Sequence, residues 1–349
     1  ALDGPAWRLL INCLVDESPV GPVPEKLTTD RSEASGTGHW GPATGEYTLA
    51  LVERALGDPA ILPRVLVPGM AASTTVTVPG SREPAGIIVG PGAGDNAGAA
   101  LGLGAGAGDV VVSIGTSGTV FAVAEWPAMD PTGAVAGFAD ASGLFLPLVA
   151  TLNAARVLGS IAGLLGVDHD GLARLALEAE PGSAGVVLVP YFEGERTPNL
   201  PEATASLHGL TIASSTRANI ARAAIEGMLC GLAAGLDAVR VVGVNEERIM
   251  LIGGAAQNIA VTTIAAQVFD APVVVPAPGE YVADGAAVQA AWALTGEHPI
   301  WPLHIIDEPT PDHRPVIRHQ SSPYASRLPA TPTPPAGPTV HLPSPGAVP

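Results

Sequence analysis

Short apolar runs that end in glycine-rich turns recur between residues 86 and 295, and this recurrence constrains the fold more than any other feature of the chain. The runs at 110–114 and 248–252 have the length and β-branched composition of buried strands, and a glycine follows each of them. A long helical pattern covers 216–241, with Thr216 as its candidate N-cap. Alternating strands, turns and helices of this kind predict an α/β fold.

Other segments continue the same alternation. Apolar stretches between turn residues predict strands, and helical spacing of apolar residues predicts helices. The expected strands cover 87–90, 119–124, 186–190 and 273–275, and the expected helices cover 49–56, 97–104, 153–165, 168–180, 258–269 and 284–295. The strands at 110–114 and 119–124 are separated by a short glycine turn, which predicts a β-hairpin.

The pattern divides the chain into three parts. Residues 1–85 show little periodicity, and the polar, glycine-rich stretch 28–47 is expected to be an ordered loop. Residues 86–303 hold the alternating strands and helices and are expected to form one domain. Proline recurs throughout 304–349, so we expect this tail to be disordered or loosely attached.

A formal net charge of −17 limits the partners of the chain. Such a surface repels nucleic acid and anionic membranes, so neither is expected as a partner. It also repels nucleotide phosphates unless backbone N–H groups and a metal ion hold them locally. The one lysine, Lys26, lies outside every glycine-rich loop, which excludes a lysine-centred phosphate loop.

Cysteine usage and the lack of targeting patterns predict a cytoplasmic protein. Cys13 and Cys230 are far apart and belong to no CxxC motif, so we do not expect a disulfide framework. The start of the sequence has no basic segment followed by an apolar one. Continuous apolar runs are too short to span a bilayer.

A carboxylate stands between a predicted strand and a predicted helix in the run Gly92-Ala-Gly-Asp-Asn-Ala-Gly-Ala-Ala. Asp95 is typical of a turn residue or a helix N-cap. Alternatively, the glycines let a substrate approach closely, and the carboxylate accepts a proton from its hydroxyl. The motif by itself leaves both interpretations open.

Two further glycine turns follow predicted strands. The run Ser113-Ile-Gly-Thr-Ser-Gly-Thr is either a hairpin turn that needs glycine for positive φ, or a phosphate cradle of backbone N–H groups and hydroxyls. The run Leu251-Ile-Gly-Gly-Ala-Ala-Gln-Asn is either a tight strand-to-helix turn or a nucleotide pocket at a helix N-terminus.

In this order the three motifs resemble the FGGY carbohydrate kinases, and the resemblance covers roughly residues 27 to 301. The local match is closest to the xylulokinases of that family, in TTDRSEASGTGHWGPATGEY, GPGAGDNAGAALG, VVSIGTSGTV, LVPYFEGERTPN and EGMLCGLAAGLDAV. The resemblance implies an α/β fold of the ribonuclease H-like (actin-like ATPase) type. It implies a complete C-terminal nucleotide-binding domain at 86–303 and a partial N-terminal sugar-binding domain at 1–85.

The resemblance also implies a role for each matching residue. Asp95 would be the general base that takes the proton from the C5 hydroxyl of D-xylulose as that oxygen attacks the γ-phosphorus of ATP, and Asn96 would lie beside the sugar. Mg²⁺ would bridge the phosphate oxygens. The other matches are ATP-binding residues: Gly115, Thr116, Ser117 and Gly118 at the β- and γ-phosphates, and Gly253, Gly254 and Asn258 at the adenosine.

Departures from the family pattern keep other functions open. The family's D-x-G-T-[ST] phosphate loop and the Met-His-Gly segment of xylulokinases do not occur before Thr28, and Ala255 replaces a glycine that the adenosine loop often has. One hypothesis is a truncated or frame-disrupted gene product. The alternatives to a working xylulokinase are an inactive nucleotide-binding remnant and a kinase for another sugar or polyol, such as glycerol or gluconate. A homodimer is left open.

The loop GERTP, at 194–198, carries charged side chains that invite a catalytic interpretation. We favour a structural interpretation over a catalytic one. In it, Glu193, Glu195 and Arg196 form an ion-pair cluster that holds the loop.

Overall fold

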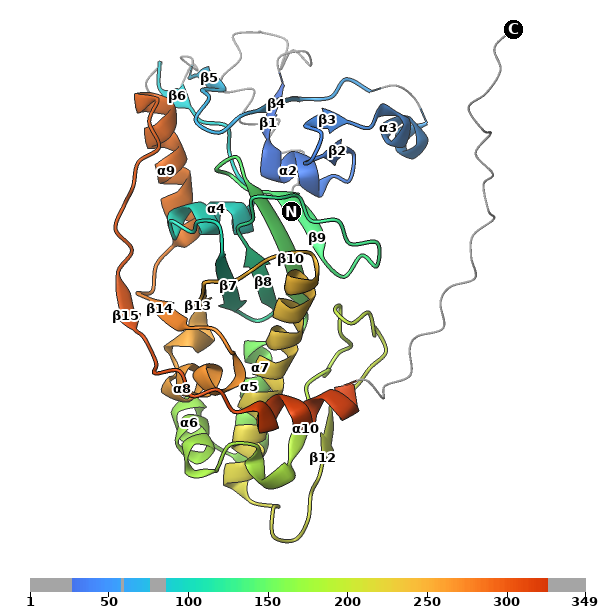
Figure 1. Ribbon diagram of the computed structural model, residues 1–349, viewed down its shortest axis with the longest axis vertical. Coiled ribbons are helices and arrows are strands. Elements are labelled where there is room, and N and C mark those ends of the chain that lie inside the picture. The colour runs from blue at the N-terminus through green and yellow to red at the C-terminus, as the bar shows by residue number, and fades with distance from the viewer. Residues whose placement is uncertain (1–26, 58–59, 76–85, 326–349) are drawn as a thin grey trace, which may run out of the picture.

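The computed structural model describes residues 27–57, 60–75 and 86–325. A seven-stranded sheet has helices on both faces, and a smaller N-terminal layer lies at one end of it (Figure 1). The expectations attached to Lys26 and Cys13 fall outside the described residues.

The large sheet combines a parallel and an antiparallel half. Its strands are β7 (Asp109–Ile114), β8 (Gly118–Ala122), β9 (Ala136–Ala139), β10 (Phe145–Thr151), β13 (Arg248–Ile252), β14 (Val273–Pro276) and β15 (Ile305–Asp307). Their order is β15-β14-β13-β7-β8-β10-β9. β13 pairs in parallel with β7 and β14, whereas β7, β8, β10 and β9 pair antiparallel in succession. The predicted α/β fold and the predicted β7–β8 hairpin are confirmed.

Helices cover both faces of the sheet because its central strand is apolar on both faces. Val110, Val112 and Ile114 of β7 belong to the core on one face and Val111 to the core on the other, as the alternation of a strand requires. The first face packs against α5 (Ala155–Leu165), α7 (Arg217–Val241) and α8 (Ile259–Val268), and the second against α4 (Asp95–Gly102) and α9 (Tyr281–Thr295) (Figure 1). The helix α6 (His169–Glu178) packs against α5, α7 and α8 and extends the core on the first face.

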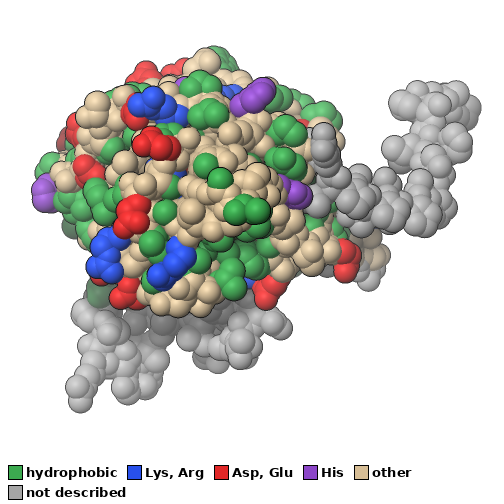
Figure 2. Space-filling view, turned by 90° about the horizontal axis from the view of Figure 1, so that it is seen from below, with side chains coloured by type: hydrophobic (Ala, Val, Ile, Leu, Met, Phe, Trp, Pro, Cys, Tyr) green, Lys and Arg blue, Asp and Glu red, His purple; other side chains and the backbone are tan. Residues whose placement is uncertain are grey.

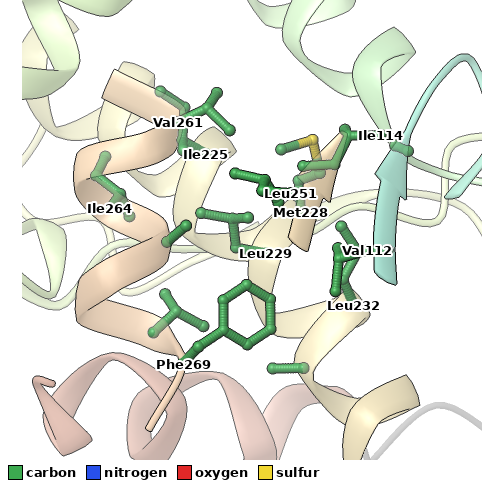
Figure 3. Close-up of a cluster of buried hydrophobic side chains, with 14 of the residues drawn as sticks. Val112, Ile114, Ile225, Met228, Leu229, Leu232, Leu251, Val261, Ile264 and Phe269 are labelled. Carbon is green, nitrogen blue, oxygen red and sulfur yellow. The ribbon is translucent and has the colours of Figure 1, made fainter. Parts of the chain in front are cut away.

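The long helix α7 is the centre of the larger core. Figure 3 shows Ile225, Met228, Leu229 and Leu232 of α7 among the side chains of the neighbouring elements. These neighbours include Val112 of β7, Leu251 of β13, and Val261 and Ile264 of α8. The predicted N-cap is confirmed, since the Thr216 hydroxyl oxygen accepts the Asn219 N–H at 3.1 Å. Neither α7 nor any other helix in the described part of the chain has the length and apolarity needed to cross a membrane.

The expectation that 28–47 is a single ordered loop is wrong. β1 (Thr28–Asp30) pairs in parallel with β4 (Arg64–Leu66), and α2 (Arg31–Gly36) follows β1 directly because the Asp30 carboxylate caps it. The layer also contains the hairpin β2 (Trp40–Gly41) and β3 (Glu46–Tyr47), the helix α3 (Leu49–Leu56), and the pair β5 (Ser73–Thr74) and β6 (Ile88–Val89). The predictions of a helix at 49–56 and a strand at 87–90 are confirmed.

The expectation of a loosely attached tail from residue 304 is wrong for its described part. β15 pairs with β14 and extends the sheet, and α10 (Pro315–Ala325) packs against α7 and α8 (Figure 1). Ile317 of α10 is only 2% exposed, and Tyr324 stacks on His208 of β12 (Ser206–His208), which pairs with β11 (Val187–Val189). Proline at the start of a helix does not prevent its formation, so the proline content of this segment was a poor guide.

The start of α4 differs from the prediction in a way that bears on function. The helix expected at 97–104 begins at Asp95, with Gly94 as an extended N-cap residue at φ −64° and ψ 161°. Asp95 and Asn96 therefore form the first turn of α4 instead of a preceding loop. The positive end of the helix dipole stabilises a carboxylate at such a position.

α4 and α9 cross so closely that their contact requires glycine. A Cβ added at Gly285 of α9 would lie 1.9 Å from the Gly98 carbonyl oxygen of α4. A Cβ added at Gly102 of α4 would lie 2.0 Å from the Tyr281 carbonyl oxygen of α9. The two backbones are thus in direct contact, which fixes the position of α4 and of the residues at its start.

Gly285→Ala is expected to lower the free energy of unfolding by at least about 1–3 kcal/mol, because the methyl group fits only if the two helices separate. Gly163→Ala in α5 is the matched control, since a Cβ there meets no atom within 4 Å. Alanine in a helix is favoured over glycine by roughly 1 kcal/mol, so this control is expected to be neutral or stabilising. Urea denaturation followed by circular dichroism measures both, and equal midpoints would contradict the close crossing.

Candidate active site

Asp95 lies at the mouth of a cavity between the N-terminal layer and the large sheet. The cavity has a volume of about 270 Å³. Its lining comes from α2, from the start of α4 and from β9 and β10: Ser32, Glu33, Gly36, Thr37, Gly94, Asp95, Asn96, Ala97, Phe138, Ala139 and Leu146. Three stretches that are far apart in sequence therefore line this cavity.

The Asp95 carboxylate is exposed, and its orientation is set by its neighbour. Its Oδ1 accepts hydrogen bonds from the Asn96 backbone N–H at 2.7 Å and from the Asn96 side-chain Nδ2 at 2.8 Å. The Asn96 Oδ1 in turn lies 3.5 Å from the hydroxyl oxygen of Thr119, which is on β8 just after the hairpin turn. Asn96 thus connects the candidate base to the candidate phosphate turn.

The charge of the cavity is acidic. Of the described residues that line it, Glu33 and Asp95 are ionisable, and no basic side chain is among them. Glu33 approaches the Asp95 loop closely, since its Oε1 lies 3.5 Å from the point where a Cβ on Gly94 would stand. Such a lining suits hydroxyl groups, which donate hydrogen bonds to carboxylates, better than it suits an anion.

The hairpin turn between β7 and β8 presents the expected polar groups. Ile114 pairs with Gly118, and Thr116 and Ser117 at the tip are exposed. The turn is the predicted hairpin turn, but neither Gly115 nor Gly118 has a positive φ, so the conformational reason given for these glycines is wrong. Gly118 is instead required by packing, because a Cβ there would lie 2.7 Å from atoms of both Leu232 and Thr151.

The Gly253–Gly254 turn lies beside this hairpin. β13 and β7 are parallel neighbours with Ile252 opposite Ser113, so both strands end at the same edge of the sheet. Gly253 has a φ of +95°, and a Cβ on it would lie 2.6 Å from the Ile114 carbonyl oxygen. Gly254 faces open space and leaves room for a ligand.

Asn258 caps the helix that follows this turn. Its Oδ1 accepts the Ala260 N–H at 2.9 Å and the Val261 N–H at 3.4 Å, so α8 starts directly after it. Its Nδ2 lies 3.5 Å from the His169 carbonyl oxygen at the start of α6. The side chain therefore orients the Gly253–Gly254 turn relative to α6.

The segment between β10 and α5, together with Glu195, supports the hairpin turn through hydrogen bonds, and the sequence did not reveal this role. The Ala155 N–H donates to the Gly115 carbonyl at 2.9 Å. The buried Glu195 carboxylate accepts hydrogen bonds from the Leu152 N–H at 2.6 Å and from Asn153 Nδ2 at 3.0 Å. The segment 151–155 is thus held between Glu195 and the hairpin turn.

The expected ion-pair cluster within the GERTP loop is only partly correct. Glu195 does stabilise the loop, but its partners are N–H groups, including the backbone N–H of Arg196 at 2.8 Å. Glu193 forms its salt bridge at 2.7 Å with Arg156 of α5. The spacing of charges along the chain could not reveal these partners, because Leu152, Asn153 and Arg156 lie about 40 positions away and only the tertiary structure brings them to the loop.

The order of the strands defines the class of the fold. An antiparallel β7-β8-β10 meander, continued by the parallel strands β13 and β14 on the other side of β7, is the ribonuclease H-like (actin-like ATPase) arrangement. Residues 110–294 match the C-terminal domain of the FGGY family of carbohydrate kinases. The chain belongs to this family.

Two curated relatives, each 44% identical to this chain, are xylulose kinases. The enzyme of Streptomyces coelicolor is 44% identical over 271 residues, which are 77% of this chain and 54% of that protein. The enzyme of Streptomyces rubiginosus is 44% identical over 276 residues, which are 78% of this chain and 55% of that protein. The chain therefore spans about half the length of the curated relatives it matches.

Solved structures agree with this assignment. The xylulose kinase from Bifidobacterium adolescentis is 42% identical and superposes with a TM-score of 0.81, over 91% of this chain and 66% of that chain. The glycerol kinase from Plasmodium falciparum with ADP is 19% identical, with a TM-score of 0.68 over 77% of this chain and 55% of that chain. At that identity the second comparison shows the shared fold alone.

Glu195→Gln is expected to lower the free energy of unfolding by about 1–3 kcal/mol, because an amide cannot accept all the hydrogen bonds that the carboxylate accepts and a buried N–H loses its partner. Glu193→Gln in the same loop is the matched control. Its side chain is 75% exposed, and a surface salt bridge contributes at most about 1 kcal/mol. Denaturant titration of the two variants and the wild type measures the difference, and a larger loss in Glu193→Gln would refute the supporting role of Glu195.

Proposed function

We propose that this chain contributes the nucleotide-binding part and one wall of the sugar site of a kinase that transfers the γ-phosphoryl group of ATP to the C5 hydroxyl of D-xylulose. The observation that carries the proposal is the connection from Asp95 through Asn96 to Thr119. Through this connection the Asp95 carboxylate, which faces the cavity, lies near a hairpin turn that is suited to bind phosphate. The relatives named as xylulose kinases support the choice of sugar.

Asp95 would act as the general base. A sugar hydroxyl bound in the cavity would donate its hydrogen bond to the carboxylate, which takes the proton as the oxygen attacks the γ-phosphorus and ADP leaves. The hydrogen bonds from Asn96 hold one carboxylate oxygen of Asp95. This restricts the orientation of the other oxygen, which favours a productive geometry before the sugar binds.

The two glycine turns would hold ATP at the adjacent edge of the sheet. Backbone N–H groups of the turn 115–118, with the exposed hydroxyls of Thr116 and Ser117, suit the β- and γ-phosphates. The open space at Gly254 suits the nucleoside, and Asn258 would act by fixing this turn. Acidic side chains are scattered among basic and hydrophobic ones on the face seen in Figure 2, and the formal net charge of the chain is −17. Local donors are therefore needed to hold the phosphates.

Mg²⁺ fits this arrangement as a companion of the nucleotide. Within the described ranges, no group of three or more His, Cys, Asp or Glu side chains could hold a metal ion by itself. Mg²⁺ commonly binds through phosphate oxygens, water and one or two carboxylates, and the exposed Asp95 could supply such a carboxylate. The bound ion would neutralise charge that develops on the phosphates.

The acidic cavity favours an uncharged sugar over a sugar acid. Glu33 and Asp95 would repel the carboxylate of gluconate, whereas both accept hydrogen bonds from hydroxyls. A gluconokinase of Bacillus subtilis is also a relative, at 29% identity over 201 residues. Gluconate is therefore the informative competitor for D-xylulose.

The wild-type chain is expected to release ADP from ATP and Mg²⁺ only when D-xylulose is present. Asp95→Asn is expected to lower kcat by about 10²–10⁴, the usual contribution of a general base, with unchanged affinity for ATP. Asp170→Asn is the matched control, because Asp170 is also an exposed carboxylate in the first turn of a helix. A coupled ADP assay and calorimetry with ATP measure both. Binding of ATP without sugar-dependent ADP release would count against the proposal and favour a nucleotide-binding protein without transfer activity.

Replacing D-xylulose by gluconate is expected to reduce kcat/KM. The ratio of kcat/KM for D-xylulose to that for gluconate is expected to be several-fold smaller in Glu33→Gln than in the wild type. The reason is that like charges a few Å apart near a surface repel by roughly 1 kcal/mol or more. Parallel assays with both compounds measure the ratio. A preference for gluconate in the wild-type chain would contradict the assignment of an uncharged substrate.

A further inference from the structure

A buried serine joins the N-terminal layer to the loop that carries Asp95. The Ser32 hydroxyl oxygen, on α2, accepts the Gly94 N–H at 2.9 Å across 62 positions of sequence. The same hydroxyl donates to Asp30 Oδ1 at 2.5 Å. Ser32 and Asp30 are 7% and 5% exposed, so water hardly competes for these hydrogen bonds.

The Asp30 carboxylate fixes the direction of the Ser32 hydroxyl. Asp30 Oδ1 also accepts the Glu33 N–H at 3.0 Å as the cap of α2, so the carboxylate is itself immobilised. The hydroxyl proton points to Asp30, and a lone pair of the oxygen is left for Gly94. Hydrogen bonds to an ionised acceptor are stronger than those between neutral groups, which makes this arrangement stiff.

The bond to Gly94 acts on the peptide directly before Asp95. Gly94 is the N-cap residue of α4, and its carbonyl accepts the Gly98 N–H at 2.8 Å. Gly94 has no side chain that could cap the helix. Its backbone is therefore held at its carbonyl by α4 and at its N–H by Ser32.

The other end of the loop is held by α9. The buried side chain of Gln289 donates from Nε2 to the Gly92 carbonyl at 2.7 Å. The loop before Asp95 thus lies between Gln289 on one side and Ser32 on the other. Of these two side chains, Ser32 belongs to α2, which lines the cavity together with the start of α4.

We propose that Ser32, oriented by Asp30, is a positioning residue for the Asp95 carboxylate. It couples the placement of α2, and hence of one cavity wall, to the backbone from which Asp95 projects. The kinetic part of this inference rests on the proposed role of Asp95 as general base. A carboxylate displaced by about 1 Å loses much of its effect on rate, so loss of the Ser32 bond is expected to reduce kcat more than substrate affinity.

Ser35 on the same helix provides a matched control. Its hydroxyl oxygen accepts the Ala139 N–H of β9 at 3.0 Å and donates to the Ser32 carbonyl at 2.7 Å. Like Ser32, Ser35 therefore accepts a backbone N–H from outside α2. Its donor lies in strand β9, whereas the donor to Ser32 lies in the Asp95 loop. Ser35 does not line the cavity.

Hydrogen–deuterium exchange of the ligand-free chain tests the positioning itself. Ser32→Ala is expected to raise deuterium uptake in a peptide that covers residues 91–98, while Ser35→Ala raises it around residue 139 and leaves 91–98 unchanged. Ser32→Thr keeps the hydroxyl and is expected to restore protection. This readout needs no activity, so it decides the proposal even if the chain transfers no phosphate. Unchanged uptake at 91–98 in Ser32→Ala overturns it.

Kinetics test the consequence for the reaction. With D-xylulose and ATP, Ser32→Ala is expected to lower kcat by about tenfold or more, with both KM values changed less than about twofold, and Ser35→Ala is expected to leave kcat unchanged. An equal fall of kcat in both variants would indicate a general loosening of α2 and overturn the specific role of Ser32.

A second variant covers the case in which Ser32→Ala does not fold. Asp30→Asn keeps an oxygen that can accept from the Ser32 hydroxyl and from Glu33 N–H, but removes the charge. Deuterium uptake at residues 91–98 in Asp30→Asn is expected to lie between that of the wild type and that of a chain whose loop before Asp95 is fully unprotected. Uptake equal to the wild type, with an unchanged kcat, overturns the role of Asp30 in orienting the hydroxyl.

Discussion

The parallel pairing of β7 and β13 is the constraint on which the rest of the site depends. Because the two strands run side by side in register, the hairpin turn after β7 and the glycine turn after β13 appear at one edge of the sheet. Gly253 packs its backbone against the Ile114 carbonyl, which no larger residue allows. Two turns that are far apart in sequence thereby lie side by side at this edge, where we propose that the nucleotide binds.

A second contact brings the candidate base to this surface. The crossing of α4 and α9 without side chains between them fixes the axis of α4, and Asp95 begins that helix. Ser32 then joins the start of α4 to α2. The candidate active site is thus assembled from the sheet edge, one helix start and one wall from the N-terminal layer, so a change in any of the three would alter the geometry of the other two.

Buried acids organise the loops of this acidic chain. Asp30, Asp109, Asp140, Glu195 and Glu226 are all less than 9% exposed, and each accepts at least one backbone N–H, from the first turn of α2 in the case of Asp30 and from turns or loops in the others. Hydrogen bonds to an ionised acceptor offset the cost of burying the charge. Part of the negative charge that the composition suggests for the surface is therefore inside, where it holds turns and helix starts.

Local patterns in the sequence determined the α/β class, four strands of the large sheet (β7, β8, β13 and β14), the helices α4 to α9, and the three glycine motifs centred on Asp95, Gly115 and Gly253. These follow from the spacing of neighbouring residues, so a single segment is enough to read them. The same patterns did not reveal β9, β10 or β15. The partners of Ser32 and Glu195, the packing reason for Gly118 and the attachment of the segment from β15 to α10 were decided only by the tertiary structure. Each depends on contacts between segments tens of residues apart, and the packing of helices on the sheet, not local propensity, brings those segments together.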